Sequence, residues 1–231
     1  MKTPLLLVPG HLTDAAMWAH QARHLADMAD ISIADMTGSD SMAGLANSIL
    51  AKAPQRFALA GLSMGGYVSF EIMRQAPERV SRLALLDTMA AGNNPTQIER
   101  RTRFMDLTRT GRFEDVLAEF TPLLVHPARH QDAALMDELG RMTRRVGAKV
   151  ALDQQQAMLD RPDSRPDLAG IACPTLVLCG RQDALTPLAA HEEMAAGIKG
   201  AKLVVVEDCG HMSTMEKPEA VTAVMRYWLQ A

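Results

Sequence analysis

The feature that most constrains this chain is a Gly-x-Ser-x-Gly pattern at residues 61–65, directly between a strand-like and a helix-like segment. The apolar run from Phe57 to Ala60 is typical of a buried strand, and apolar residues at helical spacing begin at Tyr67. So tight a turn holds its central residue in a strained backbone conformation, and its neighbours must lack Cβ atoms. The pattern predicts a strand–turn–helix unit with Ser63 at its apex.

This turn would bring a nucleophile and a hydrogen-bond donor together. Ser63 would be lifted clear of the sheet, and the backbone N–H of Met64 would lie at the helix N-terminus. Unpaired N–H groups and the helix dipole favour a developing negative charge there. The alternative is a glycine-rich turn in another kind of α/β sheet, since the chain contains 15 glycines and the motif also arises by chance.

Short apolar runs alternate with helix-like segments along most of the chain. Such alternation is typical of a parallel sheet with helices on both faces, in which sites gather beyond the carboxyl ends of the strands. We therefore predict an α/β fold with a mostly parallel central sheet. Besides the strand before Ser63, we expect strands at 5–8, 31–36, 80–86, 174–179 and 203–206, and helices at 15–28, 42–52, from Tyr67 to Pro77, and 218–229.

Residues 92–168 differ from the rest, because apolar residues recur there at helical spacings and no convincing strand occurs. We expect about four short helices, divided near Pro122, Pro127, Gly140 and Gly147. Inserted over the carboxyl ends of the strands, they would form a helical cap. Residues 1–91 and 169–231 would then form the core domain. The alternative is a set of ordinary crossover helices.

Composition and charge narrow the range of partners. The 231 residues suffice for one domain, and a net charge of −3 without long Lys/Arg runs favours neither nucleic acid nor a membrane as partner. The first apolar run is too short for a signal peptide or a spanning helix. Three cysteines without Cys-x-x-Cys spacing argue against a disulfide framework or structural zinc. We expect a cytoplasmic protein with a small-molecule partner; the sequence indicates no oligomeric state.

Two further residues lie in loops that follow predicted strands. Asp183 follows the strand at 174–179, and His211 follows the last strand. The order Ser63, Asp183, His211, each after a different strand, is that of the α/β-hydrolase arrangement. The chain resembles the α/β-hydrolase fold superfamily, in particular its small serine carboxylesterases. The segments that carry the resemblance are Val8-Pro9-Gly10-His11, Gly61-Leu62-Ser63-Met64-Gly65-Gly66, Gly180-Arg181-Gln182-Asp183 and Gly210-His211.

The resemblance implies a catalytic role for each of these three residues. Ser63 would be the nucleophile, His211 the general base and then acid, and Asp183 the group that orients the imidazole. A serine hydroxyl needs a base to become reactive, and the resulting imidazolium needs a fixed negative partner. Two rivals exist for the acid: Asp87 at the end of the fourth strand, and Asp208, which is very near His211 in sequence.

The same resemblance implies an oxyanion hole of two backbone N–H groups. One would come from Met64 and the other from His11, with Leu12 as the fallback donor. The family's usual His-Gly pair is replaced here by a Pro-Gly pair at residues 9–10. Only a backbone N–H is required, so the departure affects the His11 side chain, which would line the pocket or face water.

The remaining methionines and histidines carry weaker signals. Of the 16 methionines, we expect those beside the catalytic loops, Met89 and Met212, to line a substrate pocket with Leu12, and the others to fill the core. We expect no cofactor and no metal site. The other histidines lack paired spacing, and we expect them to face the solvent: His20, His24, His126, His130 and His191.

We expect the protein to hydrolyse a small, largely apolar carboxylic ester through an acyl-serine intermediate. A serine nucleophile argues against the dehalogenase and epoxide-hydrolase branches of the superfamily. Carbon–carbon bond hydrolases, lyases, acyltransferases and cofactor-free peroxidases use the same triad, so fold analogy does not separate these activities. A non-catalytic ligand receptor is a further alternative.

Overall fold

A computed structural model describes residues 2–230. Its centre is a six-stranded sheet in which every neighbouring pair is parallel, in the order β2-β1-β3-β4-β5-β6. The predicted α/β class with a parallel sheet is confirmed. The strands are β1 (Thr3–Val8), β2 (Ala29–Ile33), β3 (Phe57–Leu62), β4 (Val80–Leu86), β5 (Thr175–Gly180) and β6 (Lys202–Val206).

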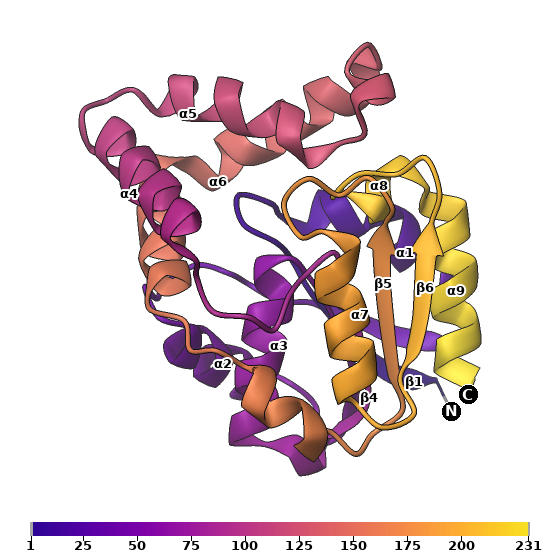
Figure 1. Cartoon of the computed structure of the whole chain (residues 1–231). Coiled ribbons are helices and arrows are strands. Elements are labelled where there is room, and N and C mark those ends of the chain that lie inside the picture. Colours follow the sequence, from indigo (N-terminus) through magenta and orange to yellow (C-terminus); the bar gives the residue numbers. More distant parts are fainter. Residues whose placement is uncertain (1, 231) are drawn as a thin grey trace.

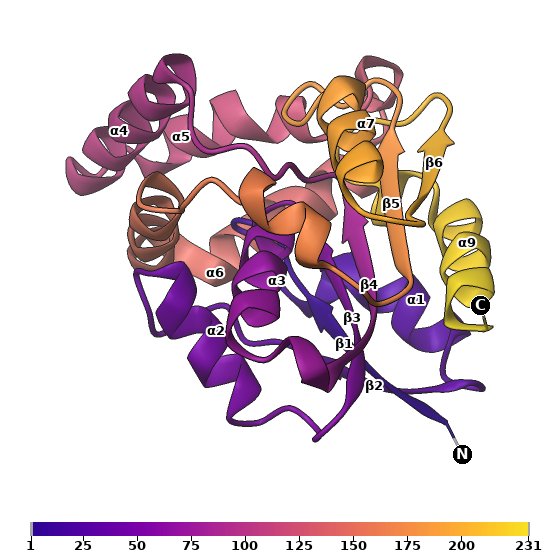
Figure 2. The ribbon, with the colours of Figure 1, turned by 60° about the horizontal axis from the view of Figure 1, so that its bottom comes forward.

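Helices cover both faces of this sheet (Figures 1 and 2). Along β1, Leu5 and Leu7 belong to one apolar core, and Leu6 and Val8 belong to the other. The central strands β3 and β5 are buried at every residue, as expected for strands covered on both faces. One face carries α2 (Met42–Leu50), α3 (Met64–Gln75) and α7 (Leu188–Gly197); the other carries α1 (Ala19–His24), α8 (Ser213–Glu216) and α9 (Pro218–Gln230).

Three helices of the central segment lie across the carboxyl ends of the strands (Figure 1). They are α4 (Pro95–Arg109), α5 (Phe113–Phe120) and α6 (Ala133–Leu159). Gly147 breaks α6 with a φ of 81°, a conformation that glycine adopts readily. Gly140 does not divide a helix, contrary to expectation. Short 3₁₀ helices occur at Ala15–Trp18, Pro77–Arg79, Thr121–Leu124, Pro127–Arg129 and Arg165–Gly170.

Two predicted boundaries were wrong near the N-terminus. The second strand was expected at 31–36, but β2 spans Ala29–Ile33, and Met36 lies in the loop with its carbonyl bonded to a glutamine of α6. The expected helix at 15–28 is a 3₁₀ turn followed by the short α1. Asp14 caps that turn by accepting from the N–H of Ala16, so local capping sets its start.

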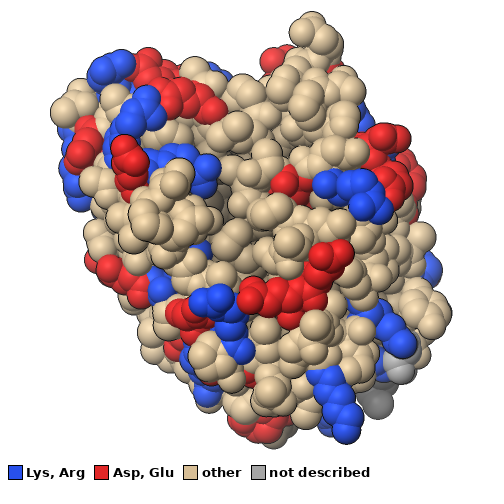
Figure 3. Space-filling view, viewed as in Figure 1, with Lys and Arg blue, Asp and Glu red and all other residues tan. Residues whose placement is uncertain are grey.

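The surface has no single dominant charge on the face shown in Figure 3, where acidic and basic side chains are interspersed. Among the described residues, many acidic and basic side chains form exposed ion pairs, such as those of Arg144 with Glu114 and of Arg181 with Glu207. Between residues 2 and 230, no helix has both the length and the apolar character required to cross a membrane.

The turn between β3 and α3 predicts a sensitive position. A Cβ atom on Gly65 would lie 2.2 Å from the carbonyl oxygen of Val8, whereas one on Gly170 would meet nothing within 4 Å. We expect Gly65→Ala to lower the unfolding free energy by about 2 kcal/mol or more, because the backbone of β1 cannot yield as a side chain can. Thermal unfolding should show a Tm lower by about 5 °C or more. Gly170→Ala is the control; equal Tm values for both variants would contradict the close-contact explanation.

Candidate active site

Ser63 occupies the strained apex that the sequence predicted. Its φ of 54° and ψ of −116° lie in a region that residues with a Cβ atom rarely adopt. Four hydrogen bonds hold its backbone. Its N–H donates to Leu86 O at 3.0 Å, and its carbonyl accepts from Thr88 Oγ1 at 2.8 Å and from the N–H groups of Gly66 and Tyr67 at 2.9 and 3.3 Å. β4 and the first turn of α3 therefore fix the position from which the Ser63 side chain projects.

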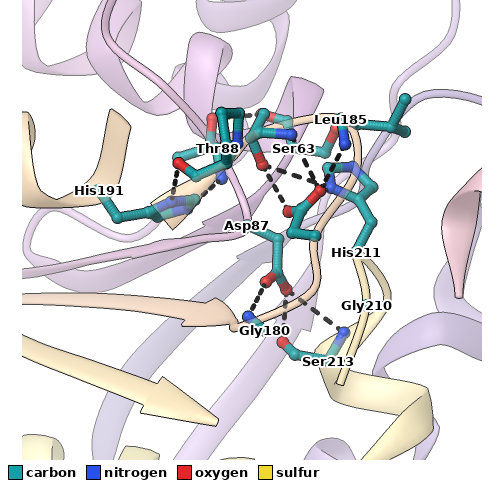
Figure 4. Close-up of polar contacts among 12 residues, drawn as sticks. Ser63, Asp87, Thr88, Gly180, Leu185, His191, Gly210, His211 and Ser213 are labelled. Carbon is teal, nitrogen blue, oxygen red and sulfur yellow. Dashed lines mark hydrogen bonds and ion pairs between the residues drawn. The ribbon is translucent and has the colours of Figure 1, made fainter. Parts of the chain in front are cut away.

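His211 lies near Ser63 (Figure 4) and is paired with Asp183. The Nδ1–H of His211 donates to Asp183 Oδ2 at 2.7 Å, and both side chains are almost completely buried. Asp183 also accepts from Thr186 Oγ1 at 2.6 Å and from the N–H groups of Leu185 and Thr186 at 2.8 and 2.9 Å. With Nδ1 committed to Asp183, Nε2 is left for the cavity that Ser63 and His211 both line.

The electrostatic surroundings favour charged forms of both members of this pair. Burial alone would lower the pKa of His211, but the charge and hydrogen bond of Asp183, assisted by Asp87 and Glu216, raise that pKa above its ordinary value. Burial opposes the charge on Asp183 as well, yet His211 and Thr186 lower the pKa of its carboxyl. The pair can therefore accept a proton on the imidazole and stabilise the cation that results.

Neither rival acid is paired with His211. Asp87 accepts from Gly180 N at 2.9 Å and from the N–H and hydroxyl of Ser213 (Figure 4). Burial, and next the charge of Asp183, raises the pKa of Asp87 to about 8. Asp208 is exposed, with a φ of 49° in the turn after β6. Asp87 instead joins β4 to β5 and to the loop of His211.

Two backbone N–H groups beside Ser63 have no acceptor within residues 2–230. They belong to His11 and Met64, the two predicted oxyanion donors. The N–H of Leu12, the fallback donor, donates to Gln154 Oε1 at 2.9 Å and is therefore occupied. Its φ of 55° turns the chain sharply at this point.

The His11 side chain is buried in a network with α6. Its Nδ1–H donates to Gln154 Oε1 at 3.0 Å, and its Nε2 accepts from Gln155 Nε2 at 3.0 Å. Burial, and then the positive charge of Arg101, lowers the pKa of His11 to about 3. His11 is therefore neutral at physiological pH and anchors the loop after β1 to α6. The sequence around His11 does not indicate that Gln154 and Gln155 contact it, because the two glutamines lie more than 140 residues away along the chain.

A small cavity of about 40 Å³ separates Ser63 from α4 and α6. This volume holds only a few water molecules. Its wall combines apolar residues such as Phe104, Phe120 and Met158 with Gln97, Arg101 and other polar groups. The three residues expected to line the pocket do not line this cavity and are buried elsewhere: Leu12, Met89 and Met212.

Two supporting residues were not recognised from the sequence. Thr186 precedes α7, whose cap position is Pro187, and the Thr186 hydroxyl binds Asp183. His191 was expected to face the solvent, but it is fully buried. Its Nε2 accepts from Thr88 N at 3.0 Å, and its Nδ1 lies 3.3 Å from Pro187 O (Figure 4). Because Thr88 also binds the Ser63 carbonyl, His191 links α7 to the strained turn.

Within residues 2–230, no cluster of three His, Cys, Asp or Glu side chains could hold a metal ion. The chemistry available at the cavity is that of a hydroxyl, an imidazole–carboxylate pair and backbone N–H groups. Such groups support nucleophilic attack by serine on a carbonyl carbon.

Buried His191 predicts a pH dependence of stability. Burial lowers its pKa to about 4, so between pH 6.5 and 4 the unfolded chain binds a proton here that the folded chain does not. This contribution to stability is complete above pH 6.5 and is lost as the pH falls. Between pH 7 and pH 5 we expect His191 to account for about 2 kcal/mol of lost unfolding free energy.

Denaturant unfolding of His191→Gln at both pH values should therefore show a smaller decrease than that of the unmodified protein. The control is His24→Gln, since His24 is exposed. Identical pH dependence in the His191 variant and the unmodified protein would contradict a neutral, buried His191.

Comparison with known proteins adds to this geometry. A family model described as the alpha/beta hydrolase fold matches residues 3–218. The pimeloyl-[acyl-carrier protein] methyl ester esterase of Nitrosomonas europaea is 25% identical over 229 residues, covering 93% of this chain and 91% of that protein. A solved thermophilic esterase from Thermogutta terrifontis is 30% identical with a TM-score of 0.90, covering 100% of this chain and 90% of its own.

A second curated relative has a different printed activity. The 2-hydroxy-6-oxononadienedioate/2-hydroxy-6-oxononatrienedioate hydrolase of Escherichia coli strain K12 is 29% identical over 176 residues. The match covers 74% of this chain but only 61% of that protein. The chain thus spans less than two thirds of this relative's length.

Proposed function

The chain belongs to the alpha/beta hydrolase fold family, and on this premise we propose that it is a serine hydrolase that cleaves a small carboxylic ester through an acyl-serine intermediate. The observation that carries the proposal is the 2.7 Å hydrogen bond between His211 Nδ1 and Asp183, which leaves Nε2 for the cavity lined by Ser63. The esterase relatives support the same class of reaction.

In the first half of the proposed reaction, His211 Nε2 accepts the proton of the Ser63 hydroxyl as its oxygen attacks the ester carbonyl carbon. The imidazolium is stabilised by Asp183, whose own position is fixed by Thr186. The N–H groups of His11 and Met64 would donate to the oxyanion. The tetrahedral intermediate then collapses, and His211 returns the proton to the departing alcohol.

In the second half, water replaces the alcohol. His211 Nε2 accepts a proton from this water as its oxygen attacks the acyl carbon of Ser63. A second tetrahedral intermediate uses the same two N–H groups, and the Ser63 oxygen leaves with the proton that His211 returns. The products are the carboxylic acid and free enzyme.

We also propose that α4, α5 and α6 act as a cap over this site. Their position across the carboxyl ends of the strands (Figure 1) and the small volume of the cavity support this role. A cap of this kind excludes bulk water and limits the size of the substrate.

The size of the cavity predicts the preferred ester. Among p-nitrophenyl esters from acetate to decanoate, we expect kcat/KM to be highest for the shortest acyl chains and to fall beyond butyrate, because longer chains must displace α4 or α6. Ser63→Ala should lower kcat/KM about 10³-fold or more for every ester. The matched control is Ser48→Ala, on the exposed side of α2. Turnover that survives in Ser63→Ala would rule out serine catalysis.

The raised pKa of His211 predicts the acidic limb of the pH profile. The base must be neutral to act, so kcat/KM should fall as the pH drops through a pKa above the ordinary value of 6.5. Asp183→Asn removes the charge that raises this pKa and leaves the imidazole without its anionic partner. We expect a rate loss of about 10²-fold or more and a limb displaced to lower pH. A profile from pH 5 to 9 measures both effects; an unmoved limb would contradict pairing with Asp183.

A second candidate is hydrolysis of a carbon–carbon bond by the same residues. It is favoured by the Escherichia coli relative and uses the same imidazole–carboxylate pair. Mass spectrometry of enzyme quenched during ester turnover distinguishes the candidates through the acyl group on Ser63. Turnover of a carbon–carbon substrate without any ester turnover would favour the second candidate.

A further inference from the structure

The wall of the cavity contains two arginines and, among the described residues, no acidic side chain. Arg100 and Arg101 of α4 both line it, and none of the described residues that line it is an aspartate or glutamate. Arg101 is only 7% exposed. Arg103, on the same helix, differs: it is exposed and forms an ion pair with Glu119. The unusual group is therefore a buried guanidinium at the site itself.

Every polar contact of Arg101 within residues 2–230 is with a neutral group. Its Nε donates to Asn93 Oδ1 at 3.1 Å, and its Nη1 donates to Gln155 Oε1 at 3.2 Å and lies 3.0 Å from Met158 Sδ. The Tyr67 hydroxyl is a further hydrogen-bonding neighbour. Burial, and the nearby charge of Arg161, lowers the pKa of Arg101 to about 10, so the guanidinium stays charged at neutral pH.

A second buried arginine increases the local charge. Arg161 is 7% exposed and lies 4.3 Å from the centre of the Tyr67 ring. It donates to Asn93 Oδ1 and to the carbonyl oxygens of Met158 and Ala91. The guanidinium groups of Arg101 and Arg161 thus both donate to Asn93 Oδ1. Tyr67, which lines the cavity, separates Arg161 from the site.

Burying a cation without an anionic partner costs free energy that neutral acceptors offset only in part. A planar guanidinium that lines a cavity provides donors in the geometry that a carboxylate accepts. On the basis of the proposed ester hydrolysis, we infer that the substrate carries a carboxylate that Arg101 binds while the ester carbonyl lies at Ser63. This differs from the largely apolar ester expected from the sequence.

The carboxylate has two possible locations in such a substrate, the acyl part or the alcohol part. Mono-p-nitrophenyl glutarate against p-nitrophenyl pentanoate tests the acyl part. 4-Carboxyphenyl butyrate against phenyl butyrate tests the alcohol part. In at least one pair we expect the charged ester to have the higher kcat/KM, because it supplies the anion that the cavity lacks.

Arg101→Met removes the charge and keeps an unbranched side chain. We expect it to lower kcat/KM for the favoured charged ester about 10- to 100-fold more than for its neutral counterpart, as loss of a charged hydrogen bond implies. Arg101→Lys should restore part of the difference. Arg103→Met, on the same helix, is the matched control and should leave the ratio unchanged. An unchanged ratio in Arg101→Met, or no preference in either pair, would overturn the inference.

A binding measurement separates this inference from the proposed reaction. Calorimetric titration of Ser63→Ala with glutarate and with pentanoate requires no turnover. We expect glutarate to bind at least 10-fold more tightly, and the preference to disappear in Ser63→Ala combined with Arg101→Met. Glutarate binding without ester turnover would retain the inference while the proposed reaction failed. Equal binding of the two acids would overturn the inference even if ester turnover were observed.

Discussion

The arrangement of this molecule depends on the close approach of three backbones around Ser63. The strained turn brings α3 so near to β1 and to its own strand that Gly61 and Gly65 have no room for a Cβ atom. Gly66 meets Thr88 in the same way. Because the contacts are mostly with backbone atoms, side-chain rearrangement cannot relieve them. The turn therefore keeps its strain only while β1, β3 and β4 stay in register.

The parallel sheet then accounts for the meeting of residues distant in sequence. Each parallel strand delivers its following loop to the same edge, so Ser63, Asp183 and His211 converge although they follow β3, β5 and β6. Asp87 follows β4 and completes the row. Burial and the nearby charge of Asp183 raise the pKa of the Asp87 carboxyl, because two adjacent carboxylates in a buried site disfavour each other's charge.

Much of the fold could be predicted from the sequence, for identifiable physical reasons. Buried strands read as continuous apolar runs, and the glycines around Ser63 mark a turn that few other residues permit. The range predicted for the second strand was wrong, because β2 lies at the edge of the sheet and its sequence is therefore less uniformly apolar. The prediction of a helix break at Gly140 is wrong, because a glycine inside a helix costs only about 1 kcal/mol, which the packing of α6 outweighs.

Only those residues of the candidate site that lie in recognisable local sequence motifs could be predicted. Ser63, Asp183 and His211 lie in or beside glycine-containing loops, whereas Arg101, Gln154 and His191 lie within ordinary helices and show no local signature. Their importance arises from contacts across large sequence separations. The sequence pattern of α7 does not show which of its faces is buried, because the buried face includes the polar residue His191. Its hydrogen bond from Thr88 N compensates for this burial.

Two hydrogen bonds accepted by Gln154 connect the loop after β1 to α6. One amide oxygen holds both the Leu12 N–H and the His11 imidazole, and the same side chain donates to Met36. Any displacement of α6 large enough to admit a ligand would therefore release the loop that presents the His11 N–H. The positions of α6 and of the loop that contains His11 are therefore coupled through this one side chain.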